Sequence, residues 1–275
     1  MTVLITGGSS GIGKHLAGAY LARGEKVVIV ADNEARLQAA RAELSTISPH
    51  VDAVSCDVAD SASVRRMVAQ VEREHGCPDI LVNNAGFAVY RSFDQSSMDE
   101  IERLIEVNLV GTLRCIRGFL PAMMNRRSGH VVNVASVAGL LPVTPCATYG
   151  AAKHGVVGIS ETLRFELRDF GVKVHLVCPG RVETSFFDHE TFRRRPARKE
   201  TEKTLPVEEV SRAIIEAVEK GRFLTVVPRS LALSAWVRNL CPPVVDLWLG
   251  RLLAQRTREA RSIHVDEEIG RGGCG

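Results

Sequence analysis

The sequence predicts an α/β fold of the doubly wound type, in which helices cover both faces of a parallel sheet. Two observations predict it. Seven short runs rich in β-branched residues alternate with longer segments of helical period. These runs are apolar almost throughout, which is typical of strands buried on both faces. The composition is that of a globular protein, since 45% of the 275 residues are hydrophobic and 24% are charged.

The predicted elements follow one another without a linker before residue 230. The strands are expected at 2–6, 26–31, 51–56, 79–83, 130–135, 172–177 and 223–227. The helical segments are expected at 11–23, 34–45, 61–75, 97–125, 150–169 and 207–220. We therefore expect one catalytic domain over 1–230, a helical extension over 231–268 and a disordered tail over 269–275.

Charge and cysteine usage limit the classes of function. The net charge of +3 is too small to indicate a nucleic-acid partner. The seven cysteines and eight histidines show no metal-ligand spacing, so we expect no metal and a reducing, cytoplasmic location. We expect the chain to start with a strand rather than with a signal peptide. Charged residues and prolines interrupt the apolar stretch 231–250, so we expect no membrane span, although contact with a membrane surface stays an alternative.

A glycine-rich turn, TGGSSGIG at 6–13, joins the first strand to the first helix. Gly7, Gly11 and Gly13 allow backbone angles and close approaches that a Cβ would block. Free N–H groups and the helix dipole at the helix start form a site for a pyrophosphate. A tight turn alone would also favour glycine. Its place after the first strand of a repeated pattern predicts a dinucleotide cofactor.

Asp32 follows the second strand, where dinucleotide-binding folds contact the adenosine ribose. Its carboxylate would accept hydrogen bonds from free ribose hydroxyls and repel a 2′-phosphate. Apart from Lys26, the segment 24–35 holds no lysine or arginine. This favours NAD over NADP, which stays open. In the alternative interpretation, Asp32 or Asn33 only caps the next helix.

Tyr149 and Lys153 stand four residues apart in ATYGAAKHG at 147–155, so they share one face of a helix. The small residues between them leave room for a molecule to approach that face. A phenol beside an ammonium is suited to proton transfer. The alternative is a half-buried tyrosine packed on the lysine stem.

Further motifs stand in a fixed order with these two. They are TGGSSGIG (6–13), CDV (56–58), NNAG (83–86), VNLVG (107–111), NVASVAG (133–139), YGAAK (149–153) and PGRVET (179–184). With Ser136 thirteen residues before Tyr149, the chain resembles the short-chain dehydrogenase/reductase family over about 2–230. The resemblance implies a Rossmann-type domain with a seven-stranded parallel sheet flanked by helices. It also implies a homodimer or homotetramer, packed through the helices over 97–125 and 150–169.

The resemblance implies roles for residues at matching positions. Tyr149 would be the general acid/base, its pKa lowered by the Lys153 ammonium and the positive nicotinamide. Lys153 would also hold the nicotinamide ribose, Ser136 would hydrogen-bond the substrate oxygen, and Asn108 would hold a water on the proton path. The cofactor would contact Gly7, Ser9, Ser10, Gly11, Ile12, Gly13, Asp32, Asp57, Val58, Asn83, Ala85, Gly86, Tyr149, Lys153, Pro179, Gly180, Val182 and Thr184.

The second strand departs from the family pattern. The family's usual acidic NAD position falls on Ala31, and Asp32 stands one residue further on. That next position often carries arginine in family members that use NADP. An aspartate there still opposes a 2′-phosphate, so NAD remains the favoured cofactor.

Apolar residues beside these positions indicate the substrate class. Five of them would form the wall of a substrate pocket, namely Leu140, Leu141, Val143, Phe186 and Phe187. Trp236 and Trp248 would close it, and a substrate loop would span about 185–205. We therefore expect an NAD(P)-dependent oxidoreductase that interconverts a secondary alcohol and a ketone on a bulky apolar substrate, such as a steroid, retinoid or lipid.

Two alternatives to this function stay open. TGGSSGIGK (6–14) and the long C-terminal extension look most like 3-ketodihydrosphingosine reductases, which implies an NADPH-dependent lipid ketoreductase. The other is a non-catalytic dinucleotide-binding sensor or scaffold. The presence of Ser136, Tyr149 and Lys153 together disfavours the sensor.

Overall fold

The computed structural model describes residues 1–184, 186, 190–193, 204–240, 243, 250, 253–259 and 261. Phe187, Trp248, the side chain of Trp236 and the tail over 269–275 lie outside the described residues. The substrate loop and the C-terminal extension are described only in part. The three domain boundaries drawn from the sequence therefore stay predictions.

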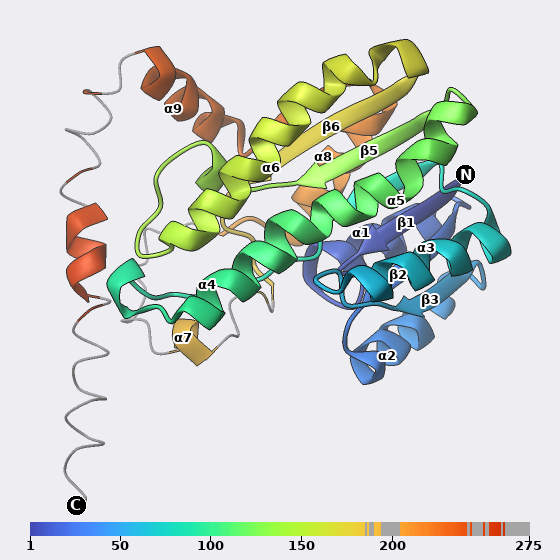
Figure 1. Cartoon of the computed structure of the whole chain (residues 1–275), viewed down its shortest axis with the longest axis horizontal. Coiled ribbons are helices and arrows are strands. Elements are labelled where there is room, and N and C mark those ends of the chain that lie inside the picture. The colour runs from blue at the N-terminus through green and yellow to red at the C-terminus, as the bar shows by residue number, and fades with distance from the viewer. Residues whose placement is uncertain are drawn as a thin grey trace, which may run out of the picture.

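Seven parallel strands form one sheet in the order β3-β2-β1-β4-β5-β6-β7, which confirms the predicted fold (Figure 1). They are β1 (Thr2–Thr6), β2 (Lys26–Ala31), β3 (Val51–Ser55), β4 (Ile80–Asn83), β5 (Gly129–Val134), β6 (Val172–Pro179) and β7 (Leu224–Val227). Chain order reverses between β1 and β4. In open sheets of this kind, the crevice at the carboxyl ends beside such a reversal is where ligands bind.

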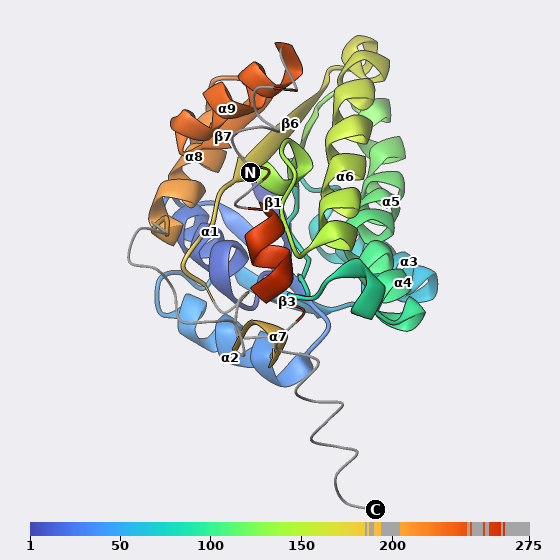
Figure 2. The same cartoon turned by 90° about the vertical axis from the view of Figure 1, so that its left-hand side faces the viewer.

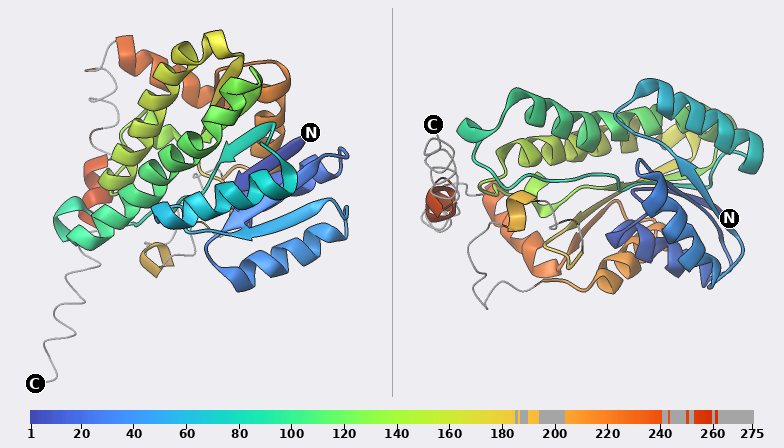
Figure 3. Two further views of the ribbon diagram at one scale, coloured as in Figure 1. Left: turned by 45° about the vertical axis from the view of Figure 1, so that its right-hand side comes forward. Right: turned by 90° about the horizontal axis from the view of Figure 1, so that it is seen from below.

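The strands are buried on both faces because alternate side chains enter two separate cores. Val3 and Ile5 of β1 lie in one core, which helices α1, α2 and α8 cover. Leu4 lies in the other core, beneath α3, α5 and α6. The view from below shows the sheet between these two helical layers (Figure 3).

The helices match the predicted segments closely. They are α1 (Gly11–Leu21), α2 (Glu34–Ser45), α3 (Ser61–His75), α4 (Met98–Ile105), α5 (Gly111–Asn125), α6 (Ala147–Glu166), α7 (Glu190–Arg193), α8 (Val207–Glu219) and α9 (Arg229–Leu240). Side chains before several of them satisfy free N–H groups. The Asp60 carboxylate accepts from two N–H groups of α3, and Ser97 and Glu100 form a capping box on α4.

The predicted helix over 97–125 is divided. A π-helical turn, η2 (Glu106–Val110), joins α4 to α5. The extra residue of a π turn often occurs at functional sites. Here the turn carries Asn108, whose side chain is completely buried.

The described part of the C-terminal region is helical. Besides α9, residues 253–259 form a short helix that lies across the carboxyl-terminal side of the sheet (Figures 1 and 2). Among the described residues, no helix is both long and apolar enough to span a membrane.

Two histidines stack between β5 and β6. His130 Nδ1 lies 3.0 Å from His175 Nε2, and His175 Nδ1 lies 2.7 Å from the carbonyl oxygen of Arg222. Burial, with His175 and Lys173 beside it, lowers the pKa of His130 from 6.5 to about 4, although Asp79 opposes the shift. Burial also lowers the pKa of His175. Both imidazoles are therefore neutral near pH 7.

This pair should make the fold sensitive to acid. Below pH 6.5 the unfolded chain takes up protons that the buried imidazoles resist, so stability falls as the pH drops toward about 4. Between pH 7 and pH 5, the melting temperature of the wild type should fall more than that of His130→Asn, which lacks one of the two titrating rings. Equal falls in the two proteins would contradict this account.

Candidate active site

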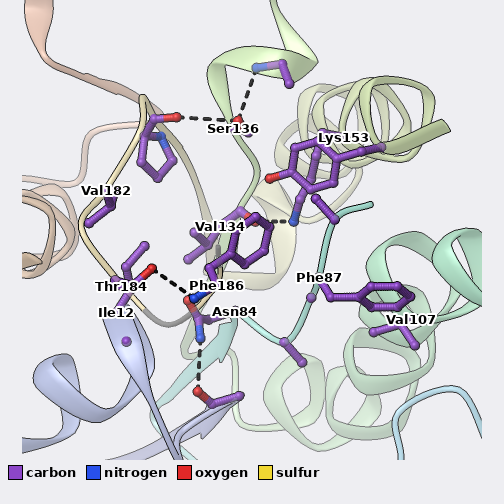
Figure 4. Close-up of a pocket in the computed structure, with 18 of the residues that line it drawn as sticks. Ile12, Asn84, Phe87, Val107, Val134, Ser136, Lys153, Val182, Thr184 and Phe186 are labelled. Carbon is purple, nitrogen blue, oxygen red and sulfur yellow. Dashed lines mark hydrogen bonds between the residues drawn. The ribbon is translucent and has the colours of Figure 1, made fainter. Parts of the chain in front are cut away.

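A cavity of about 1100 Å³ lies where the strands end. Its wall is formed by segments that follow β1 to β6, and Figure 4 shows part of it. Most of the residues selected from the sequence line this cavity, namely Gly7, Ser9, Ser10, Gly11, Ile12, Asp32, Asp57, Val58, Ala85, Gly86, Ser136, Val143, Tyr149, Lys153, Pro179, Gly180, Val182, Thr184 and Phe186. The selected residues that lie behind the lining are Gly13, Asn83, Asn108, Leu140 and Leu141.

Lys153 and Tyr149 occupy one wall, because α6 begins at Ala147 and presents both from its first two turns. The buried Lys153 Nζ donates to the carbonyl oxygen of Val134 at 3.0 Å and lies 5.7 Å from the centre of the Tyr149 ring (Figure 4). Burial lowers the pKa of Lys153 to about 8. The side chain therefore stays mainly cationic at neutral pH, in a fixed place.

The pKa of Tyr149 shifts opposite to the direction expected from its lysine neighbour. Burial raises the pKa of the phenol, and a hydrogen bond with Ser136 opposes that rise. Desolvation dominates the shift, and Lys153 is not among the groups that lower the pKa of this phenol. The phenol is thus held in its neutral, proton-donating form.

Ser136 lies between the ends of β5 and β6. Its Oγ accepts from the N–H of Ala138 at 3.1 Å, capping a short 3₁₀ turn, η3 (Val137–Gly139). The same Oγ is 3.5 Å from the carbonyl oxygen of Pro179, to which it donates (Figure 4). These contacts hold the hydroxyl beside Tyr149, where it partly offsets the rise in the pKa of the phenol.

Asn108 lies behind the wall that carries Tyr149 and Lys153 rather than on it. Its Nδ2 donates to the carbonyl oxygens of Phe87 at 2.9 Å and Leu104 at 3.0 Å. Its buried Oδ1 has no hydrogen-bond partner. A Cβ on Gly86 would lie 2.5 Å from this oxygen and 3.6 Å from Lys153 Nζ, so both atoms border the same glycine. A buried acceptor without a partner calls for a small polar ligand such as water.

The glycine turn is closed by Asn84, which the sequence analysis did not select. Asn84 Nδ2 donates to the carbonyl oxygens of Thr6 at 3.0 Å and Gly7 at 3.3 Å (Figure 4). Gly7 has a φ of +66°, and a Cβ on Gly13 would lie 2.2 Å from the Gly7 oxygen. Gly13 therefore allows the turn to pack, and Gly7 lines the cavity.

Asn83, the neighbouring residue that was expected to contact the cofactor, is buried in the protein interior instead. Its Nδ2 donates to Asn133 Oδ1 at 2.9 Å, and the residue is buried. The alternation of side chains along a strand explains the difference, because consecutive residues face opposite sides. The NNAG motif was the signal for this segment, but it did not distinguish its two asparagines.

The end of the cavity near β2 and β3 carries charges of both signs. Asn33 caps α2, because its side chain accepts from the N–H of Arg36 at 2.9 Å. Asp32 is therefore not the helix cap, and its side chain is exposed. Arg36 also lines this end of the cavity, and it stands one residue beyond the segment 24–35, in which Lys26 is the basic residue. Arg103 of α4 pairs with Asp57 at 3.0 Å. Only the fold brings Arg103 here, so no local pattern could have indicated it.

Aromatic residues line the other end. The Phe186 ring meets the Tyr149 ring edge-on at 5.9 Å, and Tyr90 packs against Phe192 at 5.5 Å. The wall is completed by residues that the sequence analysis did not select for it, among them Tyr90, Phe192, Thr144, Cys146, Leu231 and Arg256.

Two residues expected in this wall pack elsewhere. Leu140 packs against a core cluster containing Ala135 and Val156, and Leu141 is buried. The cause is the 3₁₀ turn after Ser136, which turns these side chains toward the protein interior. Val143, further along the same loop, does line the cavity.

Comparison with known proteins agrees with this geometry. The family model described as short chain dehydrogenase matches residues 1–194. An uncharacterized oxidoreductase of Saccharomyces cerevisiae is 34% identical over 233 residues, which cover 82% of this chain and 72% of the yeast protein.

Solved structures of similar proteins contain either dinucleotide. A short-chain dehydrogenase from Sphingobium yanoikuyae in complex with NADPH is 32% identical, with a TM-score of 0.75 over 87% of this chain and 94% of that one. A short-chain dehydrogenase/reductase from Burkholderia phymatum in complex with NAD is 28% identical, with a TM-score of 0.79 over 90% of this chain and 94% of that one.

The packing of the glycine turn can be tested by two matched substitutions. Gly13→Ala should destabilise the fold by about 1–3 kcal/mol, because the new methyl group overlaps the Gly7 oxygen. Gly158→Ala, in the middle of α6 with open space around it, should instead stabilise by roughly 0.5–1 kcal/mol. Chemical denaturation measures both, and a Gly13→Ala variant as stable as the wild type would refute the steric argument.

Proposed function

The chain belongs to the short-chain dehydrogenase family, and on this premise we propose that it is an NAD(P)-dependent oxidoreductase that interconverts a secondary alcohol and a ketone. One observation carries the proposal. Ser136, Tyr149 and Lys153 line the same cavity as the glycine turn and Asp32. Proton-transfer groups and a dinucleotide-binding turn therefore share one space.

The residues of the cavity fit a dinucleotide. A side chain at Gly13 would collide with the carbonyl oxygen of Gly7, so glycine at this position allows the turn to pack closely. The side chain of Ser10 does not cap α1, which leaves N–H groups at the start of the helix open to a pyrophosphate. In our proposal Asp57 and Val58 contact the adenine, and Val182 and Thr184 contact the nicotinamide amide; all four line the cavity. When bound, the nicotinamide exchanges a hydride with the substrate carbon.

In our proposal, the chain supplies the proton and the orientation. Ser136 Oγ hydrogen-bonds the substrate oxygen, and Tyr149 gives its proton to that oxygen when a ketone is reduced. The raised pKa of Tyr149 supports this role, since it keeps the phenol protonated. Lys153 passes a proton to the phenolate of Tyr149 and regains one from bulk solvent through a water that Asn108 Oδ1 would hold, and this water would satisfy an otherwise unpartnered acceptor.

The proposed substrate is bulky and apolar. Phe186, Tyr90 and Phe192 provide aromatic walls beside Tyr149, and Val143 and Leu231 add apolar surface. A steroid, retinoid or lipid ketone fits such walls. An NADPH-dependent lipid ketoreductase is the second candidate, because Arg36 lines the adenosine end and could pair with a 2′-phosphate.

Assembly and location stay predictions. We propose a homodimer or homotetramer packed through α4, α5 and α6, a region where Phe165 exposes 64% of its surface. The expectation of a cytoplasmic location rests on the pattern of cysteines in the sequence.

Removal of one hydroxyl tests the proposed proton transfer. Tyr149→Phe should lower kcat/KM for apolar ketones at least about 100-fold, while the thermal shift produced by the cofactor persists. Tyr20→Phe is the matched control, because its buried hydroxyl has no partner and lies in the core on α1. Unchanged turnover in Tyr149→Phe would refute the mechanism. Cofactor binding with no turnover in the wild type would favour the sensor or scaffold.

The choice of cofactor can be read from melting temperatures. With Asp32 opposing a 2′-phosphate, NAD should stabilise the wild type more than NADP at equal concentration. Asp32→Ala should increase the shift with NADP, whereas Arg36→Leu should decrease it and leave the shift with NAD unchanged. A larger shift with NADP in the wild type would reverse the preference and favour the second candidate.

A further inference from the structure

We propose that Arg103 is a positioning residue of the cofactor site. It holds the carboxylate of Asp57 as an acceptor for the exocyclic amine of adenine, so that the site distinguishes adenine from a purine with a carbonyl oxygen at that position. This inference rests on the proposed oxidoreductase function and deepens it. Both residues line the cavity, Arg103 from α4 and Asp57 from the turn after β3.

Tight packing of α5 on the turn after β3 brings Arg103 to this place. The helix α4 continues through η2 into α5, and a Cβ on Gly111, the first residue of α5, would lie 2.7 Å from Val58 Cγ2. Arg114 of α5 donates from Nε to Ser61 Oγ at 2.9 Å and from Nη1 to the carbonyl oxygen of Val58 at 3.5 Å. Because these contacts fix the helical run against the turn, Arg103 is held beside it.

The carboxylate of Asp57 is held from two sides. Its Oδ1 accepts from the N–H of Ala59 at 2.9 Å, and its Oδ2 pairs with Nη1 of Arg103 at 3.0 Å. Each carboxylate oxygen carries two lone pairs, and the side chain of Asp57 still exposes 37% of its surface. Acceptor positions therefore remain for a ligand in the cavity. The guanidinium acts through its pair with Asp57, which fixes the direction of the carboxylate.

The surroundings of this pair fit a purine. Val58 follows Asp57 and Val107 follows Arg103 by four residues, and both line the cavity, where they offer apolar surface to a flat ring; Figure 4 shows Val107. A carboxylate can only accept hydrogen bonds, so it favours the amine of adenine and opposes the carbonyl oxygen of hypoxanthine. A dinucleotide that carries hypoxanthine should therefore bind more weakly than one that carries adenine.

The test compares NAD with nicotinamide hypoxanthine dinucleotide, in which a carbonyl oxygen replaces the purine amine. Calorimetry gives the Kd of each dinucleotide without turnover. The wild type should bind NAD about tenfold more tightly than the analogue, or better. Arg103→Met should raise the Kd for NAD about three- to fivefold and leave the Kd for the analogue nearly unchanged, so the ratio of the two falls. Arg103→Lys should restore part of the ratio.

Asp57→Asn tests the acceptor itself. The amide keeps an oxygen that can accept from Ala59 and gains a donor, so the analogue should bind as tightly as NAD or more tightly. An unchanged ratio in Asp57→Asn, or a ratio near one in the wild type, would overturn the inference. Equal losses of both ligands in Arg103→Met would also overturn it, since a merely structural role produces them. A larger loss with the analogue would do the same, because it would assign Arg103 to the base.

Arg41→Met is the matched control. Arg41 pairs with Asp52 of β3 at 3.2 Å, is as exposed as Arg103 and lies outside the cavity lining, so both Kd values should stay as in the wild type. If the wild type binds only NADP, the comparison is made with NADP and its hypoxanthine analogue. If it binds neither dinucleotide, the proposed function fails. If it binds and turns over either of them and Arg103→Met keeps the wild-type ratio, only this inference fails.

Discussion

The hydrogen bond from the Lys153 ammonium to the carbonyl oxygen of Val134 is the contact on which the geometry of the site depends. Val134 is the last residue of β5, and Ser136 follows it by two positions. Lys153 stands on α6, one helical turn after Tyr149. A buried ammonium needs an acceptor, since its desolvation is otherwise too costly. That need fixes α6 against the end of β5 and so holds the phenol of Tyr149 beside the hydroxyl of Ser136.

Buried polar side chains extend this constraint through the middle of the sheet. Asn83 of β4 donates to Asn133 of β5, and Asn133 in turn donates to Ser160 of α6, both at 2.9 Å. Thr6 Oγ1 accepts from the N–H groups of Asn84 and Ala85 at 3.0 Å. A network of this kind is stable only when its members are paired in one register. The strands below the cavity are thereby fixed relative to the helix that carries Tyr149 and Lys153.

The sequence predicted the fold well, because apolar strands and amphipathic helices leave periodic patterns that need no tertiary information. Most of the described residues that it selected do line the cavity, since parallel strands all end at one edge. It could not predict side-chain direction after the 3₁₀ turn that follows Ser136, where Leu141 is buried and the partly buried Leu140 packs against a core cluster. Nor could it place Arg103 or Arg256, which reach the cavity from distant segments. The pKa of Tyr149 shifts the other way because the cost of desolvating the phenolate dominates.

The charges of the described residues differ between the two ends of the cavity. At the end near β2 and β3, Asp57 is paired with Arg103 and Asp32 lies near the start of the helix that carries Arg36, so the described charges there largely cancel. Recognition of a ribose or its phosphate at that end then depends on the positions of these groups rather than on a strong field. At the opposite end Lys153 is buried and largely cationic at neutral pH. The buried ammonium is therefore a stronger attraction for a negatively charged group than the end of the cavity near β2 and β3, where the charges largely cancel.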